Sequence, residues 1–280
     1  MGLVLRYLLL AMLLLPQASA TAALTNNMFA IRHLGYSEGL SSQRVFSIVE
    51  DQHSAIWVAT KLGIDRYNGQ IVKNYTLPGA LHYGDMAGRQ LRLLYDQHQG
   101  LWAYDHTGRI FLYSTENDAF ELQLTLGEAI GGEIILNKIF MDVQGDLWMA
   151  LSRGLYKKEK DGKIVPVLSD RYINDMVSDS TSLFVGTSTG VVQLVPGQAP
   201  RWIIQNEDVQ TLYYHHQEKE LWVGTFNNGL WIWCPETADY LPLAGQSPGF
   251  LNPIRAITSY DPQTMLVGVD GGGVYSVDLS

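Results

Sequence analysis

The sequence of 280 residues predicts an all-β repeat protein, and two observations carry this prediction. First, a strand-like segment with a large apolar residue recurs, each time followed by a glycine turn; the clearest copy is 221–225 before Gly229. Second, these anchor residues lie 45, 46, 36, 38 and 44 residues apart. The anchors are Trp57, Trp102, Trp148, Phe184, Trp222 and Leu266. A period of about 40 residues with this patterning is typical of the blades of a β-propeller, which bury their faces only against neighbouring blades.

The first blade shows the elements of the repeat most clearly. Strands are expected over 45–49, 55–60, 64–67 and 71–75, because each run is apolar or alternating and is bounded by turn residues such as Asn68-Gly69. The same order predicts six four-stranded blades, which form a complete wheel or six blades of a larger one, seven-bladed or double. Their approximate bounds are 43–78, 88–124, 134–168, 171–204, 208–243 and 252–280.

The last blade is one strand short. Strands are expected over 254–259, 265–269 and 273–277, and no residues remain for a fourth before Ser280. Residues 28–34 form a short apolar segment ahead of blade one. Because unpaired strand edges promote aggregation, we expect 28–34 to complete blade six if the wheel is self-contained. In a longer protein, this segment would pair with a blade outside the chain.

Residues 1–20 resemble a secretory signal peptide. Arg6 supplies the positive charge, residues 7–15 are apolar, and Ala18-Ser19-Ala20 has the form of a cleavage site. An apolar run of nine residues reaches roughly 14 Å as a helix, well short of the ~30 Å hydrocarbon core. A cleaved signal is therefore favoured over an uncleaved anchor, and 21–280 would form the exported propeller domain.

The composition argues against two classes of binding partner. The net charge is −9, and no block of Lys or Arg is present, which argues against nucleic acid and against direct contact of the mature domain with an anionic membrane. Cys234 is the only cysteine, so no intrachain disulfide can form and the fold depends on apolar burial.

Three aspartates lie six residues before an anchor Trp: Asp51, Asp96 and Asp142. Gly100 and Gly145 occupy the turn position that Ser54 fills in blade one. An Asp that accepts from backbone N–H groups two residues on, next to a residue that tolerates positive φ, explains such a turn. A metal site built from these carboxylates with His53 or His98 is the alternative. Because the turns belong to different blades, its ligands would be spread around the ring, and we expect no metal and no cofactor.

Several stretches of blade one resemble the two-component regulator propeller repeat. They are 38–42, 45–51, 56–60 and 63–69, and the resemblance extends from about residue 28 to the end, most strongly in blades one and five. The resemblance implies the periplasmic sensor region of a bacterial hybrid two-component system, which binds a carbohydrate or similar ligand. Such a region signals by conformational change through a linker domain and a membrane helix to a kinase or DNA-binding output.

The chain departs from that family pattern in size. Family members usually carry two seven-bladed wheels, whereas this sequence has about six blades and no recognisable linker, membrane helix, kinase or output module. We therefore expect no kinase activity in this polypeptide, and expect it to act as a homodimer or with a sensor-kinase partner.

A ligand is expected on the face where the loops after strands four and two gather around the channel. Arg44, Arg89 and Arg255 fall at or within one residue of the same position at the start of strand one, in blades that would be neighbours in a closed ring. The loops between strands two and three add Lys61, Asp105, His106, Arg153, Phe226, Asn227 and Asn228. Arg binds carboxylates bidentately and Phe226 could stack on a sugar, which predicts an oligosaccharide ligand, with acidic sugars favoured. The alternative is that these are ordinary solvated loop residues.

Two other functions stay open. A propeller glycoside hydrolase or lyase of the sialidase type needs paired carboxylates, or a Tyr–Glu pair, beside an Arg cluster. Arginines are present, but Asp105 and Asp208 are isolated and no pair stands out, so the sequence predicts no catalytic residues and a protein that is not an enzyme. A protein-interaction propeller is the third possibility.

Overall fold

The computed structural model describes residues 33–79, 90–179, 181–235, 237, 239–242 and 252–279. The chain divides into two units, 1–33 and 34–280, and the second holds all the elements described below. The signal peptide and Arg89 lie outside the described residues, as do residues 28–32 of the expected closing strand.

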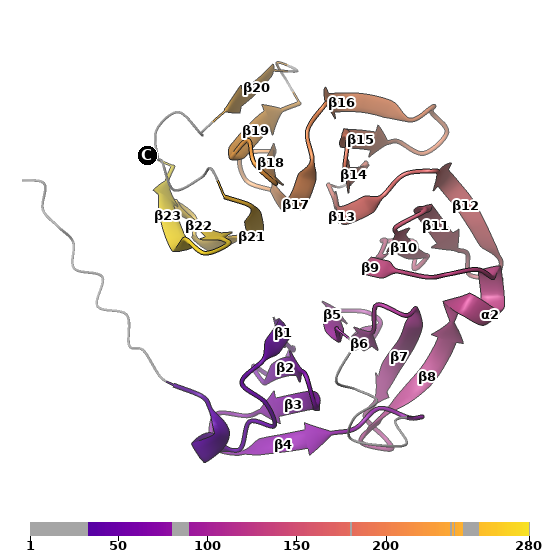
Figure 1. Cartoon of the computed structure of the whole chain (residues 1–280), viewed down its shortest axis with the longest axis vertical. Helices are drawn as coiled ribbons and strands as arrows, with labels where there is room; N and C mark the ends of the chain where they lie inside the picture. The colour runs from indigo at the N-terminus through magenta and orange to yellow at the C-terminus, as the bar shows by residue number, and fades with distance from the viewer. Residues whose placement is uncertain are drawn as a thin grey trace, which may run out of the picture. The chain divides into compact units, whose positions relative to one another are not determined.

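Residues 34–280 form six antiparallel sheets grouped around a common centre, which confirms the predicted β-propeller (Figure 1). Blade one contains β1 (Val45–Glu50), β2 (Ile56–Thr60), β3 (Gly63–Tyr67) and β4 (Val72–Tyr75). Blade two contains β5 (Arg92–Asp96), β6 (Gly100–Tyr104), β7 (Arg109–Ser114) and β8 (Ala119–Thr125). Blade three contains β9 (Leu136–Met141), β10 (Leu147–Leu151), β11 (Gly154–Lys158) and β12 (Ile164–Ser169).

The second half repeats this order. Blade four contains β13 (Ile173–Ser178), β14 (Leu183–Thr187), β15 (Gly190–Leu194) and β16 (Arg201–Gln205). Blade five contains β17 (Val209–His215), β18 (Glu220–Thr225), β19 (Leu230–Cys234) and β20 (Asp239–Pro242). Blade six contains β21 (Ile254–Asp261), β22 (Thr264–Val269) and β23 (Gly273–Asp278), with no fourth strand in the part of the chain that the structure describes. The short helices are η1 (Tyr36–Glu38) and α2 (Leu126–Ile130).

Within each blade the strands are paired in sequence order, and the first strand lies nearest the centre (Figure 1). Successive first strands contact one another, in the order β1, β5, β9, β13, β17 and β21. Contacts of this extent do not join β21 to β1 among the described elements. The inner strands therefore lie around the centre of the wheel, and their ends carry the loops in which a ligand is expected.

The core lies between blades, as the repeat of anchor residues predicts. Trp57, Phe184 and Trp222 are at most 1% exposed. Trp57 of blade one packs on Tyr113 and Phe120 of blade two, with ring centroids 4.9 and 6.0 Å apart. The anchors of blades one to five pack in this way with apolar residues of the next blade, which holds neighbouring blades together.

The turn aspartates behave as expected in blades one and three. Asp51 accepts from the backbone N–H of His53 at 2.8 Å, and its second oxygen accepts from Trp57 Nε1 at 2.7 Å. Asp142 likewise accepts from Trp148 Nε1 at 2.8 Å. Each carboxylate therefore ties its turn to the anchor of the same blade.

Blade two differs by one residue. Ser54 and Gly145 have positive φ three residues before the anchor, whereas Gly100 has its φ of 88° two residues before Trp102. Gly100 is therefore not equivalent to the other two, contrary to the sequence alignment. Asp96 accepts from the backbone N–H groups of the turn at 2.8 and 2.9 Å, but Trp102 Nε1 finds no acceptor among the described residues.

Candidate ligand-binding face

A repeated backbone hydrogen bond places the two expected sets of loops side by side. The residue after strand two donates to the carbonyl of the residue before strand one, as Lys61 N does to Arg44 O at 2.9 Å. The same bond recurs in blades three to six: Ser152 to Ile135, Ser188 to Tyr172, Phe226 to Asp208 and Asp270 to Pro253, at 2.8–3.1 Å. The predicted convergence of these loops on one face of the channel is therefore present.

In five blades the first strand carries a β-bulge at its second residue. The bulged residues are Phe46, Asn137, Asn174, Gln210 and Arg255. Blade two shows no register shift between β5 and β6. A bulge re-aims a side chain that the regular pleat would direct elsewhere, and bulges are common beside functional sites.

The bulged side chains connect successive blades. Asn137 Nδ2 donates to Ile173 O at 2.7 Å, and Asn174 Nδ2 donates to Val209 O, also at 2.7 Å. Arg255 Nη1 donates to Gln210 Oε1 at 2.8 Å. Hydrogen bonds from one repeated position therefore cross every blade boundary from blade three to blade six.

Exposed side chains of blades five and six lie together on this face. Arg255 is 50% exposed and pairs with Asp270 through Nε and Nη2, at 3.2 and 2.9 Å. Gln210 Nε2 donates to Asp208 Oδ1 at 2.9 Å, and Phe226, which is 45% exposed, is hydrogen-bonded through its backbone to Asp208. We call Asp208, Gln210, Phe226, Arg255 and Asp270 the five–six lip.

Two other predicted residues lie in the loop next to Phe226. Asn227 and Asn228 are exposed, and Asn228 Nδ2 donates to Glu207 Oε2 at 2.8 Å. The structure therefore brings Phe226, Asn227, Asn228 and Arg255 to neighbouring loops of one face.

Arg44 does not occupy the position of Arg255. It precedes β1 and lies two residues before the bulged Phe46, whereas Arg255 is itself the bulged residue. Its guanidinium lies 5.5 Å from the centre of the Phe46 ring. The predicted common register is therefore wrong: Pro253 is the counterpart of Arg44, because its carbonyl accepts from Asp270 N as that of Arg44 accepts from Lys61 N, and Arg255 lies two residues further on. Arg44 and Lys61 are nevertheless neighbours on the same face through their backbone hydrogen bond.

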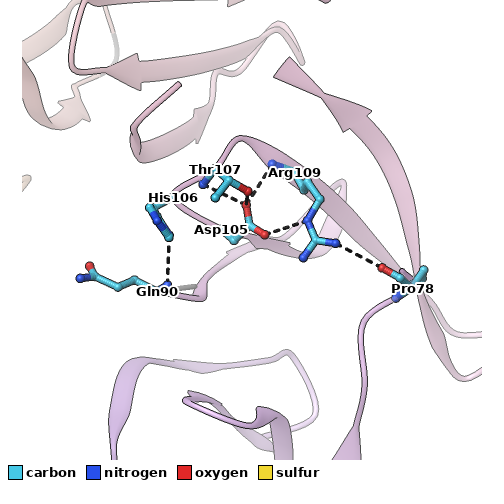
Figure 2. Close-up of polar contacts among 6 residues, drawn as sticks. All are labelled: Pro78, Gln90, Asp105, His106, Thr107 and Arg109. Carbon is cyan, nitrogen blue, oxygen red and sulfur yellow. Dashed lines mark hydrogen bonds and ion pairs between the residues drawn. The ribbon is translucent and has the colours of Figure 1, made fainter. Parts of the chain in front are cut away.

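Asp105 is a structural residue and not a ligand contact (Figure 2). Its side chain is fully buried and accepts from Thr107 N and Oγ1 at 3.1 and 2.7 Å, and from Arg109 N and Nε at 3.1 and 2.8 Å. In other blades a threonine hydroxyl closes the same turn, at Thr60, Thr187 and Thr225. Blade two uses a carboxylate instead, and Arg109 offsets its charge.

His106 and Arg153 are also committed to protein contacts. Figure 2 shows His106, whose Nδ1 accepts from Gln90 N at 3.3 Å, while its carbonyl accepts from Leu136 N at 2.8 Å. Arg153 Nη2 donates to the carbonyls of Ile130 and Gly131 at the end of α2, at 3.3 and 2.8 Å. Both residues therefore join loops, and their role as ligand contacts stays a prediction.

Asp175 is a residue that sequence reasoning missed. It follows the bulge in β13, is 7% exposed, and forms an ion pair with Lys138 of blade three. It also accepts from Thr211 Oγ1 at 3.1 Å and from Leu212 N at 2.8 Å in blade five. One carboxylate thus joins three blades. No repeat signal could identify it, because the equivalent positions carry unlike residues: Ser47, Arg92, Lys138, Thr211 and Ala256.

In the described ranges, no three His, Cys, Asp or Glu side chains lie together in a way that could hold a metal ion. The helices found in those same ranges are all too short or too polar to cross a membrane.

Comparison with known proteins finds the same fold among solved structures. No protein-family model and no curated protein sequence matches the chain. Among solved structures, the extracellular domain of the proposed hybrid two-component system BT3049 of B. thetaiotaomicron is 20% identical, with a TM-score of 0.70 over 89% of this chain and 35% of that one. PorZ of Porphyromonas gingivalis, a surface component of the type IX secretion system, is 14% identical, with a TM-score of 0.63 over 82% of this chain and 38% of that one.

An enzyme shares the architecture as well. Virginiamycin B lyase from Staphylococcus aureus is 12% identical, with a TM-score of 0.61 over 84% of each chain. Likeness at these identities establishes the fold. The chain is a β-propeller with the architecture found in extracellular domains of hybrid two-component systems, in agreement with the resemblance of its repeats, and it spans just over a third of the length of the first two structures.

Proposed function

We propose that this chain is a ligand-sensing propeller that is exported to the periplasm and recognises a saccharide on its channel face. The observation that carries the proposal is the five–six lip, where a half-exposed guanidinium at the start of β21 and an exposed aromatic ring in the loop after β18 lie on the same face. A guanidinium binds carboxylates bidentately, and an aromatic ring packs on the apolar face of a sugar. The lip therefore fits an acidic oligosaccharide, with Arg44 and Lys61 as additional basic contacts on the same face.

The same geometry supplies a route for signalling. Arg255 bridges blades five and six through Gln210, and a ligand carboxylate competes with Gln210 and Asp270 for its guanidinium. Binding therefore exchanges an inter-blade hydrogen bond for a ligand contact. The signal would pass as a shift between blades to a kinase or output module carried by another segment or by a partner.

The proposal assigns no catalysis to the chain. The carboxylates at the lip are engaged by protein groups: Asp208 by Gln210, Asp270 by Arg255 and Glu207 by Asn228. Because the lyase shares this fold, a panel of glycosides and polysaccharides is the required check. Product release that is lost when a lip residue is replaced would establish an enzyme instead.

Titration calorimetry with acidic and neutral oligosaccharides tests the binding proposal. Since a hydrogen bond to a charged group contributes about 1.5–3 kcal/mol, Arg255→Ala should weaken binding of an acidic oligosaccharide roughly 10- to 100-fold, and Arg44→Ala should weaken it further. Arg201→Ala is the matched control, because Arg201 is exposed on the outer strand β16. Equal affinity in Arg255→Ala and Arg201→Ala, or no acidic glycan that binds, would contradict the proposal.

Export has its own measurement. Mass spectrometry of the secreted protein should show a mature chain that begins after Ala20. A mature chain that still begins at Met1 would contradict this part of the proposal.

A further inference from the structure

Blade two carries a large residue where the five other blades carry a small one. The position pairs with the residue after the strand-one bulge, and it is Ala59, Ala150, Gly186, Gly224 and Gly268 in blades one and three to six. A Cβ on Gly186 would lie 2.7 Å from Val209 of the next blade, and one on Gly224 would lie 2.6 Å from Ile254. The small residue therefore lets the next blade pack closely. In blade two this residue is Tyr104, which pairs with Arg92.

Tyr104 acts as a wedge between blades two and three. It is 3% exposed and packs with Leu136 and Ile139 of β9. Burial raises the pKa of its hydroxyl to about 12, against the opposing effects of Arg92 and of the backbone N–H of Ile139, so the ring is uncharged at neutral pH. Consistent with a wedge, β5 and β9 contact each other less extensively than any other pair of successive first strands.

A cleft lies between the two blades that the wedge separates. It has a volume of about 270 Å³ and is lined by β6, β7 and β8 of blade two, by the ends of β9, β10 and β11 of blade three, and by turns of both blades. A second hollow of about 330 Å³ continues it and shares Gln99, Met141, Gly145 and Lys160. These turns join strands one to two and three to four, so they lie on the face opposite the five–six lip. The volumes are near the lower end of the roughly 300–1,000 Å³ range of small-molecule pockets.

Trp102 lines this cleft and lacks the hydrogen bond to a turn aspartate that Trp57 and Trp148 make. Trp57 and Trp148 are bound by the turn aspartate of their blade, whereas the shifted turn at Gly100 leaves the indole N–H of Trp102 without an acceptor among the described residues. Trp222 also lacks an acceptor, but it is fully buried against blade six. Trp102 is therefore the anchor that is partly exposed, lacks an acceptor for its indole N–H among the described residues, and lies beside a cleft.

The remaining lining is mixed. Gln99, Gln123 and Gln144 contribute amides, and the charged residues are of both signs, with Lys158 and Lys160 against Asp96, Asp142 and Glu159. The apolar part of the lining is Ile110, Leu124, Met141 and Leu147. Gly145, whose φ is 84°, lies beside Gln99 in this lining, and a Cβ there would lie 2.9 Å from Gln99 Nε2. Amides both donate and accept, which matches hydroxyl groups, and the ring of an aromatic residue matches the apolar face of a sugar.

We propose that the cleft between blades two and three is a second binding site, which takes a small neutral polyhydroxylated ring such as a mono- or disaccharide. The ligand packs on the exposed part of Trp102, and its hydroxyl groups bind the amides of Gln99 and Gln123. This site is separate from the five–six lip in position and in the charge of its ligand. It deepens the proposed function by adding a neutral sugar, and either site can fail without the other.

Ligand-detected NMR by saturation transfer tests this with maltose, cellobiose and lactose as probes. At least one should bind the wild-type protein, and Trp102→Ala should weaken binding at least tenfold. Gln99→Ala should also weaken it, and this variant matters because Gln99 lies on a turn outside the core. Trp148→Phe is the matched control, since it changes the equivalent anchor of the next blade. Arg255→Ala should leave binding unchanged.

The outcomes separate clearly. No saturation transfer to any of the three probes overturns the proposal, as does binding that persists in both Trp102→Ala and Gln99→Ala. Loss of binding in Arg255→Ala alone assigns the neutral sugar to the five–six lip and also overturns the proposal. Loss in Trp102→Ala and Gln99→Ala, with Trp148→Phe and Arg255→Ala unaffected, supports it.

Discussion

Replacing Asp175 by alanine should be among the most destabilising substitutions on the channel face. The carboxylate accepts from the backbone N–H groups of Met176 and Leu212 at 2.8 Å each, and it is the counter-ion of Lys138. Alanine removes the carboxylate, so both N–H groups lose their acceptor and Lys138 loses its counter-ion. The change therefore weakens the junction of blades three, four and five without altering any loop.

The size of the effect follows from the burial of the groups left behind. Each buried N–H that loses its acceptor costs about 1–3 kcal/mol, and breaking a buried ion pair costs about 3–5 kcal/mol. The Lys138 side chain is 31% exposed, so water partly compensates for the lost counter-ion. We expect Asp175→Ala to lower the free energy of unfolding by about 3–5 kcal/mol, which lowers the melting temperature of a domain of this size by roughly 10 °C.

Urea unfolding followed by circular dichroism measures this directly. Asp270→Ala is the control, because it removes a carboxylate from the same face that is 55% exposed, and exposed ion pairs contribute about 1 kcal/mol or less. Asp175→Asn should lie between wild type and alanine, because the amide oxygen can still accept one of the bonds. If Asp175→Ala cost no more than Asp270→Ala, the carboxylate would not be what joins these blades.

Three further outcomes are expected. Gly190→Ala should destabilise blade four by about 3 kcal/mol or more, because φ is 140° and a Cβ would lie 2.1 Å from a backbone oxygen, whereas Gly197→Ala, with open space around it, should cost only about 1 kcal/mol in urea unfolding. Burial works to raise the pKa of Asp51, but hydrogen bonds from Trp57 Nε1 and two backbone N–H groups outweigh it and hold the pKa below its usual value. The stability that Asp51 contributes is therefore present above about pH 4 and lost as the pH falls, so Asp51→Asn should show a smaller loss of stability than wild type between about pH 5 and 3. Deletion of residues 21–34 should cost several kcal/mol if this segment closes blade six, and an unchanged melting transition would mean that it does not.

The sequence was sufficient for the architecture because the architecture is repetitive. An anchor residue packs against the next blade in blades one to five, and in the first three blades an Asp six residues earlier closes the turn, so both signals are local and recur along the chain. Trp57 with Asp51 and Trp148 with Asp142 appear in the structure as that pattern predicts. The face on which the loops converge also follows from strand order alone.

The candidate sites depend on features that no single repeat reveals. β1 and β21 carry the same bulge, and the pairing of these strands places Arg44 before β1 but Arg255 at the second residue of β21, so the two are not equivalent although the sequence aligns them. Asp105 looks like a channel carboxylate, but it takes the place of a turn threonine and is buried. Gly100 carried a usable signal, because it lies one residue nearer to its anchor than Gly145 does.

What the sequence by itself determined is therefore the blade, because a strand order and a buried anchor are set by neighbours along the chain. What only the tertiary structure decided is which side chains meet across blades. Asp175 joins residues that lie 36 and 37 positions further along the chain. Tyr104 separates blades two and three, whereas the equivalent residue of each other blade is glycine or alanine. Contacts between blades depend on the angle and spacing at which two sheets pack, and one large residue or one bulge changes both.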